Sequence, residues 1–382
     1  MSKENNIPEE WIETTLGEVC EIKYGKDHKH LLDGKIPCFG SGGLMRNVDT
    51  ILYDKPSVLI PRKGTLSNLF YIDKPFWTVD TLFYTKINEN KILPIFLYYK
   101  LKTYNLENLN VGSAVPSLTT AVLNQFPFEI PPLPEQKTIA NVLTSFDNKI
   151  ELLQAQNKTL ESIAQTIFKE WFGKYQIGDD LPEGWRVEKL GELIDEIIDN
   201  RGKTPPLTKL EENGIPLIEV NSITGNDRNV NINLSKKAVN KETYQNWFRK
   251  GHPIFGDILI STVGSIGQLG QVFNERICIA QNIVALRSSR YSLFLYELLK
   301  RNQKLIISLD ISSVQPSIKV PHLLDMAIII PNNESMNNFN KKMKTIITKT
   351  NYNYNQIQTL KKTRDTILPK LMSGELRVNE IE

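Results

Sequence analysis

The sequence predicts an α+β protein in which two similar mixed α/β domains follow one another, each ending in a long helix. Two observations favour this class: the chain contains an internal repeat, and each copy closes with a long segment whose apolar residues recur at heptad spacing. The predicted domains are residues 1–133 and 179–333, and the predicted helical segments are 134–178 and 334–382. A chain of 382 residues, 40% of them hydrophobic, can build more than one core.

The internal repeat is visible near both ends of each domain. Residues 8–18 (PEEWIETTLGE) match residues 182–192 (PEGWRVEKLGE) at a shift of 174. Farther along, the shift is 200, so that Ser117 and its neighbours recur around Ser317. The difference between the two shifts predicts about 26 additional residues in the second copy, inserted between residues 193 and 257.

The first part of each copy combines strand-like runs with turn residues. Residues 57–60 and 257–260 are short apolar runs, and Gly and Pro punctuate the segments around them. This pattern predicts compact mixed domains without specifying the order of their strands.

The closing segments predict long helices. Pro134 and Glu135 suit the first turn of a helix, and the chain then runs to Trp171 without another Pro or Gly. A helix over residues 139–171 would be about 50 Å long, which is more than a domain of this size buries by itself, so we expect it to pair with the second helix. Residues 134–173 have a net charge of −1 and residues 334–374 one of +6, which is compatible with such a pair or with a DNA-facing surface.

The predicted interface of the helix pair follows the heptad spacing in both segments. Polar residues interrupt it at Asn157, Thr350, Asn353 and Arg364, where they can set register and orientation. The apolar positions are Leu143, Phe146, Ile150, Leu153, Leu160 and Ile167 in the first helix, and Met343, Ile346, Ile357, Leu360, Ile367 and Leu371 in the second.

Composition excludes several classes of protein. No apolar stretch approaches the roughly 20 residues of a membrane span, and the acidic start is no signal peptide, so we expect a cytoplasmic protein. Three scattered cysteines, Cys20, Cys38 and Cys278, predict neither a disulfide framework nor a cysteine metal site. A net charge of +3 is too small to indicate nucleic-acid binding by itself.

Catalytic motifs are largely excluded as well. Gly202, Lys203 and Thr204 imitate the end of a P-loop, but Ile197 stands where that loop needs a glycine. No carboxylate or cysteine pattern completes a metal site with His28 and His30. The sequence therefore predicts no metal and no catalytic activity of this chain alone.

Polar side chains in Gly-marked loops are the candidates for binding DNA. Arg and Lys bind phosphate oxygens or guanine edges, and Asn and Gln bind adenine through two hydrogen bonds. Each copy holds such a set at roughly matching positions but with different side chains, as two readers of different sequences would. The candidates are Lys23, Tyr24, Lys26, Arg62, Lys63, Thr65, Ser67 and Asn68 in the first copy, and Asn200, Arg201, Lys203, Asn221, Thr262, Ser265, Gln268, Gln281 and Asn282 in the second.

Four segments together resemble a known family. Residues 130–140 (IPPLPEQKTIA), 112–118 (GSAVPSL) and 368–376 (LPKLMSGEL), with the opening Trp-x4-Leu-Gly-Glu, resemble the DNA specificity (S) subunits of Type I restriction-modification enzymes. The likeness covers almost the whole chain. The second copy departs from it at residues 330–335 (IPNNES), where an Asn can still cap the helix.

The resemblance implies two target recognition domains, each reading one half of a bipartite site in double-stranded DNA. It implies that the long helices pack as an antiparallel coiled coil, which would relate the domains by a pseudo-twofold axis and fix the spacer between half-sites. The implied partners are two methyltransferase (M) subunits and restriction (R) subunits, with no membrane. S-adenosylmethionine, ATP and Mg are expected on these partners, and no cofactor on this chain.

Three alternatives remain open at this level. The chain could be the recognition component of a Type IIB-like system, in which one partner chain both methylates and cleaves. It could be a stand-alone DNA-modifying enzyme, a nuclease or methyltransferase with an unrecognised active site. It could also be a coiled-coil scaffold that binds no DNA.

Overall fold

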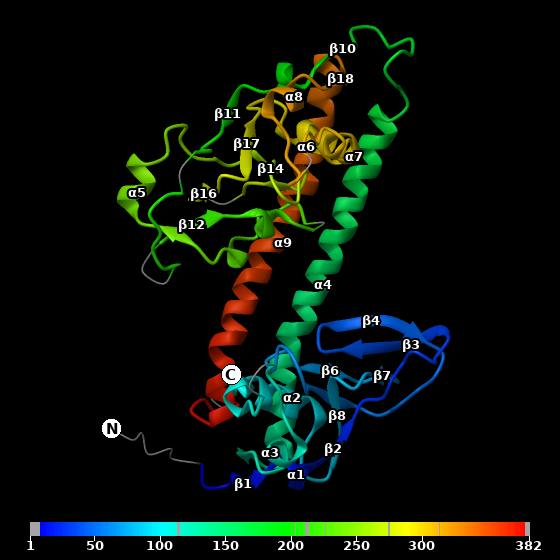
Figure 1. Ribbon diagram of the computed structural model, residues 1–382, viewed down its shortest axis with the longest axis vertical. Helices are drawn as coiled ribbons and strands as arrows, with labels where there is room; N and C mark the ends of the chain where they lie inside the picture. Colours follow the sequence, from blue (N-terminus) through cyan, green and yellow to red (C-terminus); the bar gives the residue numbers. More distant parts are fainter. Residues whose placement is uncertain are drawn as a thin grey trace. The chain divides into compact units, whose positions relative to one another are not determined.

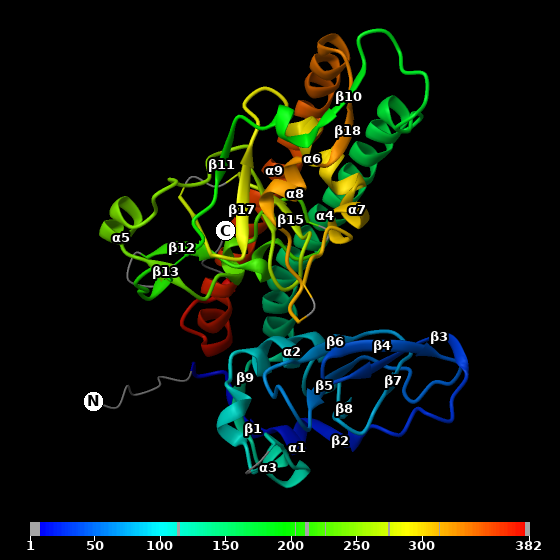
Figure 2. The same ribbon diagram turned by 45° about the horizontal axis from the view of Figure 1, so that its top comes forward.

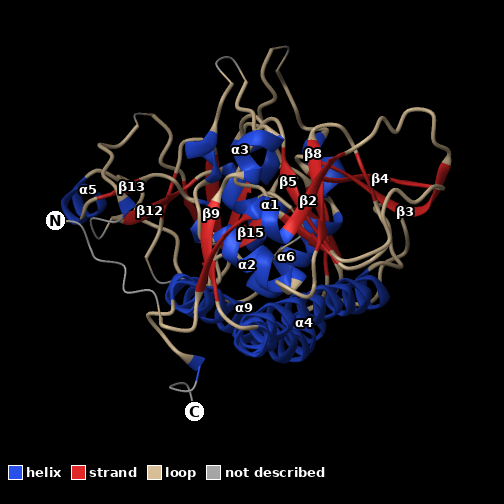
Figure 3. Ribbon diagram, turned by 90° about the horizontal axis from the view of Figure 1, so that it is seen from below, coloured by secondary structure: helices blue, strands red, loops and turns tan. Residues whose placement is uncertain are grey.

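The chain forms two compact units, each containing one of the two repeated mixed domains (Figure 1). Unit 1 consists of Met1–Ile150 with Gln358–Glu382, and unit 2 of Glu151–Ile357. Each unit therefore contains a part of both long helices, and each combines helices with strands (Figure 3). The computed structural model describes residues 8–112, 115–202, 204–210, 214–225, 227–273, 276–312 and 314–378.

Unit 1 contains two sheets and a separate strand pair. A four-stranded antiparallel sheet has the order β2-β8-β5-β6, and a three-stranded sheet has the order β4-β3-β7 with β3 and β7 parallel. Strands β1 and β9 pair antiparallel, and Figure 2 shows β3 and β4 on the side of β6 that faces away from α2. The elements are β1 (Ile12–Thr15), α1 (Leu16–Val19), β2 (Cys20–Tyr24), β3 (Asp33–Gly40), β4 (Gly43–Val48), β5 (Ser57–Pro61), β6 (Phe70–Ile72), β7 (Trp77–Thr78), β8 (Leu82–Ile87), α2 (Pro94–Lys102), α3 (Thr120–Asn124) and β9 (Pro127–Ile130).

Unit 2 repeats this topology. Its four-stranded sheet has the order β11-β17-β14-β15, its three-stranded sheet the order β13-β12-β16 with β12 and β16 parallel, and β10 pairs with β18. The elements are β10 (Arg186–Lys189), β11 (Glu196–Ile198), β12 (Ile215–Ile218), β13 (Ala238–Val239), α5 (Lys241–Asn246), β14 (Ile258–Ser261), β15 (Leu269–Gln271), β16 (Cys278–Ile279), β17 (Ile283–Arg287), α6 (Ser292–Arg301), α7 (Gln303–Ile307), α8 (Val320–Leu324) and β18 (Ala327–Ile330). The predicted mixed fold of two repeated domains is confirmed.

The apolar runs of the repeat form the central strands. Every residue of β5 and of β14 is buried, because each strand lies inside its four-stranded sheet and pairs on both sides. The predicted insertion in the second copy also has a structural counterpart. It includes α5, which precedes β14, whereas residues 49–56 before β5 form no helix.

The long helices are α4 (Leu133–Phe172) and α9 (Asn333–Ser373), and within each unit their segments run antiparallel. In unit 1, Leu143 of α4 joins a core cluster with Leu368 and Leu371 of α9. In unit 2, Phe172 of α4 joins a cluster with Phe339 of α9. The end of one helix thus packs beside the beginning of the other. None of the described helices meets the length and hydropathy needed to cross a bilayer.

Lys100 fastens the end of α9 to unit 1. Its side chain is 2% exposed, and its Nζ donates a hydrogen bond of 2.6 Å to the carbonyl oxygen of Met372. A cation at this position satisfies a carbonyl that the helix end leaves without an intrahelical partner. Burial lowers the pKa of Lys100 to about 8, although the Glu129 carboxylate 3.6 Å away opposes that shift.

We expect Lys100 to contribute a measurable pH dependence. Because its pKa is lower in the folded than in the unfolded chain, the unfolded chain binds more protons between about pH 8 and 10.5, and folding stability rises with pH there. Relative to Lys100→Met, wild type should gain about 3 kcal/mol of unfolding free energy across this window. Denaturant unfolding of both proteins at pH 7.5 and 10 measures this gain, and a constant difference between them would contradict it.

Candidate nucleic-acid interface

The same turn follows the central strand in both units. Gly64 after β5 and Gly264 after β14 have φ values of +90° and +80°, a conformation that favours glycine. Each donates its backbone N–H to a proline carbonyl, that of Pro116 at 3.1 Å and that of Pro316 at 2.9 Å. The backbone frame is therefore shared between the two repeats.

The side chains on this frame differ between the units. Unit 1 presents Arg62 and Lys63 before its glycine, whereas unit 2 has Thr262 and Val263 at the matching positions. Lys63 is exposed, and Thr262 is fully buried, with its backbone N–H donated to the carbonyl of Asn282. One backbone conformation thus carries a basic surface in one copy and a neutral one in the other.

Arg62 and Tyr24 form the most defined candidate group in unit 1. The Arg62 guanidinium carbon lies 5.4 Å from the centre of the Tyr24 ring, and Nη1 donates a 2.9 Å hydrogen bond to the carbonyl of Asp80. Tyr24 is 51% exposed, so the pair presents both a cation and an aromatic face to solvent. Such a pair can contact a phosphate or a guanine edge.

The other candidates of unit 1 lie nearby in sequence but differ in solvent exposure and in the polar contacts that their side chains make. Thr65 and Lys26 are exposed, and Ser67 donates a 3.4 Å hydrogen bond to Glu107. Lys23 forms an ion pair with Glu21. Asn68 donates its Nδ2 to the carbonyl of Ser41 at 2.7 Å, so this amide group ties two loops together.

Unit 2 brings several candidates into one pocket of about 710 Å³. Gln281 donates its Nε2 to the hydroxyl of Thr204 at 2.8 Å, and Asn282 has a buried Oδ1 without a hydrogen-bond partner among the described residues. The Arg201 guanidinium donates hydrogen bonds to both carboxylate oxygens of Asp199. Burial acts to raise the pKa of Asp199, but the contacts with Arg201 outweigh this effect and lower that pKa. The candidates that line the pocket are Arg201, Ser265, Gln281 and Asn282.

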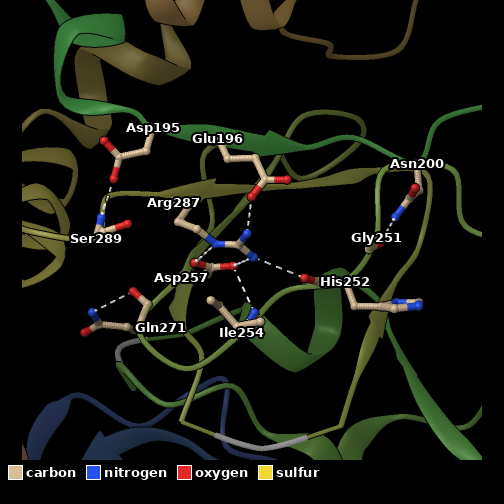
Figure 4. A network of polar contacts seen from close by, with 11 residues as sticks. Asp195, Glu196, Asn200, Gly251, His252, Ile254, Asp257, Gln271, Arg287 and Ser289 are labelled. Atoms are coloured by element: carbon tan, nitrogen blue, oxygen red, sulfur yellow. Dashed lines mark hydrogen bonds and ion pairs between the residues drawn. The ribbon is translucent and has the colours of Figure 1, made fainter.

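Four other candidates of unit 2 do not line this pocket, and Lys203 lies outside the described residues. Asn200 donates to the carbonyl of Gly251 and accepts from the N–H of Lys250, so it joins two loops (Figure 4). Asn221 donates to the carbonyl of Leu234 at 3.0 Å. The remaining two are the buried Thr262 and the half-buried Gln268.

An arginine that the sequence did not single out organises the loop beside Asn200. Arg287 on β17 donates from Nε and Nη2 to the two carboxylate oxygens of Asp257, at 3.0 and 2.8 Å, and also pairs with Glu196 (Figure 4). Its Nη2 also donates to the carbonyl of His252. Arg287 is therefore a structural residue of this loop. Arg287 left no local sequence signal, because it stands at the end of a strand and its acidic partners lie 30 and 91 residues away.

Three of the four predicted polar positions of the helix pair lie together in unit 2. Asn157 donates its Nδ2 to the carbonyl of Thr350 at 3.2 Å, and Asn353 donates its Nδ2 to Asn157 Oδ1 at 3.0 Å. In unit 1, Arg364 of α9 forms an ion pair with Asp147 of α4, which also accepts a hydrogen bond from Tyr99. These contacts join α4 and α9 within each unit.

The predicted apolar interface residues fall into two groups. Six are buried: Leu143, Ile150, Leu153, Met343, Ile357 and Leu371. Six are half-buried: Phe146, Leu160, Ile167, Ile346, Leu360 and Ile367. At three of the latter positions the next residue along is buried instead, namely Phe168, Ile347 and Leu368. Phe168 and Ile347 belong to the core cluster of unit 2 and Leu368 to that of unit 1, so each helix also buries a face against a domain core.

No group of three or more potential metal-ligating side chains occurs among the described residues. The three cysteines are free and buried. Burial raises the pKa of Cys20 and of Cys278 to about 12, so neither thiol is ionised at neutral pH.

The family model for the Type I restriction modification DNA specificity domain matches residues 8–162 and 182–365, so the chain belongs to this family. The resemblance noted in the sequence is confirmed, and the chain is a DNA specificity subunit of a Type I restriction-modification system.

Two relatives from Methanocaldococcus jannaschii match over most of their length. The Type I restriction enzyme MjaIX specificity subunit is 26% identical over 350 residues, covering 86% of this chain and 80% of the relative. The MjaVIII specificity subunit is 24% identical over 419 residues, covering 98% and 95%. The crystal structure of a Type-I restriction-modification system S subunit from M. genitalium has a TM-score of 0.61 at 19% identity, covering 97% of this chain and 98% of that one, which supports the fold.

Proposed function

We propose that each repeat domain reads one half of a bipartite DNA site and that the helix pair fixes the spacer and docks two methyltransferase subunits. The chain itself performs no catalysis in this proposal. S-adenosylmethionine belongs to the methyltransferase subunits, and ATP and Mg to restriction subunits, all in the cytoplasm.

The observation that carries this proposal is the shared turn with different side chains. Gly64 and Gly264 hold the same backbone hydrogen bond in the two units, while the residues before them change from Arg-Lys to Thr-Val. A conserved backbone conformation with exchanged side chains is what two readers of different half-sites require, because base-edge contacts are made by side chains.

A domain exchange tests this proposal. Residues 20–120 would be replaced by the matching segment of another specificity subunit, and the methylated bases would be mapped in cells that also express the methyltransferase partner. We expect one half of the motif to change and the other half to stay. A motif that is unchanged, or that changes in both halves, would contradict the assignment of one half-site to each domain.

Arg62 offers a point test of the first half-site. Arg62→Ala should weaken or relax recognition there by about 1 to 3 kcal/mol, because a bidentate contact or a phosphate contact is lost. Arg201→Ala tests the second half-site in the same way. Binding of the assembled complex to DNA variants of each half-site measures both effects. Wild-type affinity and base preference in both variants would remove these arginines from the interface.

A further inference from the structure

Part of the segment inserted in the second copy contacts both long helices. Arg228 lies in this insertion, and its guanidinium is completely buried. It pairs with Glu161 of α4, at 3.1 Å from Nε to Oε2, and with Glu297 of α6. Its guanidinium carbon also lies 3.8 Å from the centre of the Tyr296 ring.

The next two residues contact α9. Asn229 donates its Nδ2 to Asn351 Oδ1 at 3.1 Å, and the carbonyl oxygen of Val230 accepts a 3.2 Å hydrogen bond from the hydroxyl of Tyr354. Residues 228–230 thus bind α4 through the first residue and α9 through the second and third. We call these three residues the helix clamp.

The helix clamp is also fixed to the sheet of unit 2. The N–H of Gln271, on β15, donates to the carbonyl of Arg228 at 2.6 Å, and Nη1 of Arg228 donates to Gln271 Oε1 at 3.2 Å. Gln271 in turn donates its Nε2 to the carbonyl of Gly256, in the loop before β14 (Figure 4). A continuous set of polar contacts therefore leads from the four-stranded sheet of unit 2 to both long helices.

The buried ion pairs of Arg228 restrict the orientation of the groups that they join. A buried arginine between two carboxylates must keep its partners, since moving either one away leaves an uncompensated charge in the interior. The repeat does not supply this arrangement in unit 1, because Leu97 and Lys361 stand at the positions matching Glu297 and Glu161.

We propose that the helix clamp is a positioning element that holds the second recognition domain in one orientation on the helix pair and so determines which DNA spacer the complex accepts. This inference rests on the proposed reading of a bipartite site. Adding one base pair to a spacer moves a half-site by about 3.4 Å and rotates it by about 34°. A domain that cannot turn on its helices rejects that change unless the DNA itself twists.

The test uses a triple variant of the assembled complex, Arg228→Met with Glu161→Gln and Glu297→Gln, which removes the three charges together and roughly keeps side-chain volume. The matched control is Lys189→Gln, which breaks the exposed ion pair with Asp325 elsewhere in unit 2. Methylation rates are measured on DNA whose half-sites are constant and whose spacer is native, one base pair shorter or one longer.

We expect wild type and Lys189→Gln to prefer the native spacer by about tenfold or more, a typical cost of one mismatched feature in a site. The triple variant should lose most of this preference while its base preference within each half-site stays unchanged. An assembled triple variant with wild-type spacer preference would overturn the proposal. If it does not assemble, Asn229→Ala with Tyr354→Phe carries the same expectation and the same contrary outcome. Wild type that methylates no split site would refute the proposed function instead.

Discussion

Leu153→Asp should lower the unfolding free energy of unit 2 by about 3 to 5 kcal/mol, because it places an unpaired charge in the interior. Leu153 lies on α4 and is 2% exposed. It is one helical turn from Asn157, which bonds to Thr350 and Asn353 of α9, so the two α4 side chains share one face. The variant should therefore also separate α4 from α9 and reduce assembly with the partner subunits.

The neighbouring leucine provides the control. Leu152 has the same side chain, lies on the same helix and is 51% exposed, so Leu152→Asp should change stability by less than about 1 kcal/mol. Denaturant unfolding and size-exclusion analysis of the assembled complex measure both variants. Equal effects of the two substitutions would show that the buried face of α4 is assigned wrongly.

Phe339→Ala should lower the unfolding free energy of unit 2 by about 3 to 5 kcal/mol, the usual cost of removing a buried aromatic ring. Phe339, on α9, is fully buried. Its ring centre lies 5.1 Å from that of Phe172 on α4 and 6.2 Å from that of Phe294 on α6. Phe339 therefore joins three helices, and its loss leaves a cavity between them.

Phe255 is the matched control for this truncation. It is 67% exposed, so Phe255→Ala removes the same atoms with little change in buried area and should cost less than about 1 kcal/mol. Thermal or denaturant unfolding distinguishes the two variants. A Phe339→Ala protein as stable as Phe255→Ala would mean that this aromatic cluster does not support unit 2.

The repeat and the helices could be predicted from the sequence because both depend on local patterns. The matching motifs at shifts of 174 and 200 correspond to equivalent strands, and Pro134 and Glu135 lie in the first turn of α4 as expected. The strand order could not be predicted, because the parallel pairing of β3 with β7 joins segments that no local pattern connects. The end of α9 could not be predicted either, because a proline usually interrupts a helix but α9 continues through Pro369 to Ser373.

The candidate site was predictable as a region rather than as individual contacts. Gln281 and Asn282 line one pocket with Arg201. Asn200 and Asn68 are instead engaged with backbone carbonyls, since an amide side chain can satisfy a neighbouring loop as readily as a base edge. Arg228 gave no sequence signal, because its partners lie 67 and 69 residues away.

Two repeated domains on one helix pair should read a split DNA site. Mapping methylated bases in DNA from cells that express this chain with its methyltransferase partner measures whether they do. We predict a motif of two different half-sites separated by a spacer of one fixed length. A single contiguous motif, or two half-sites at variable separation, would contradict the claim.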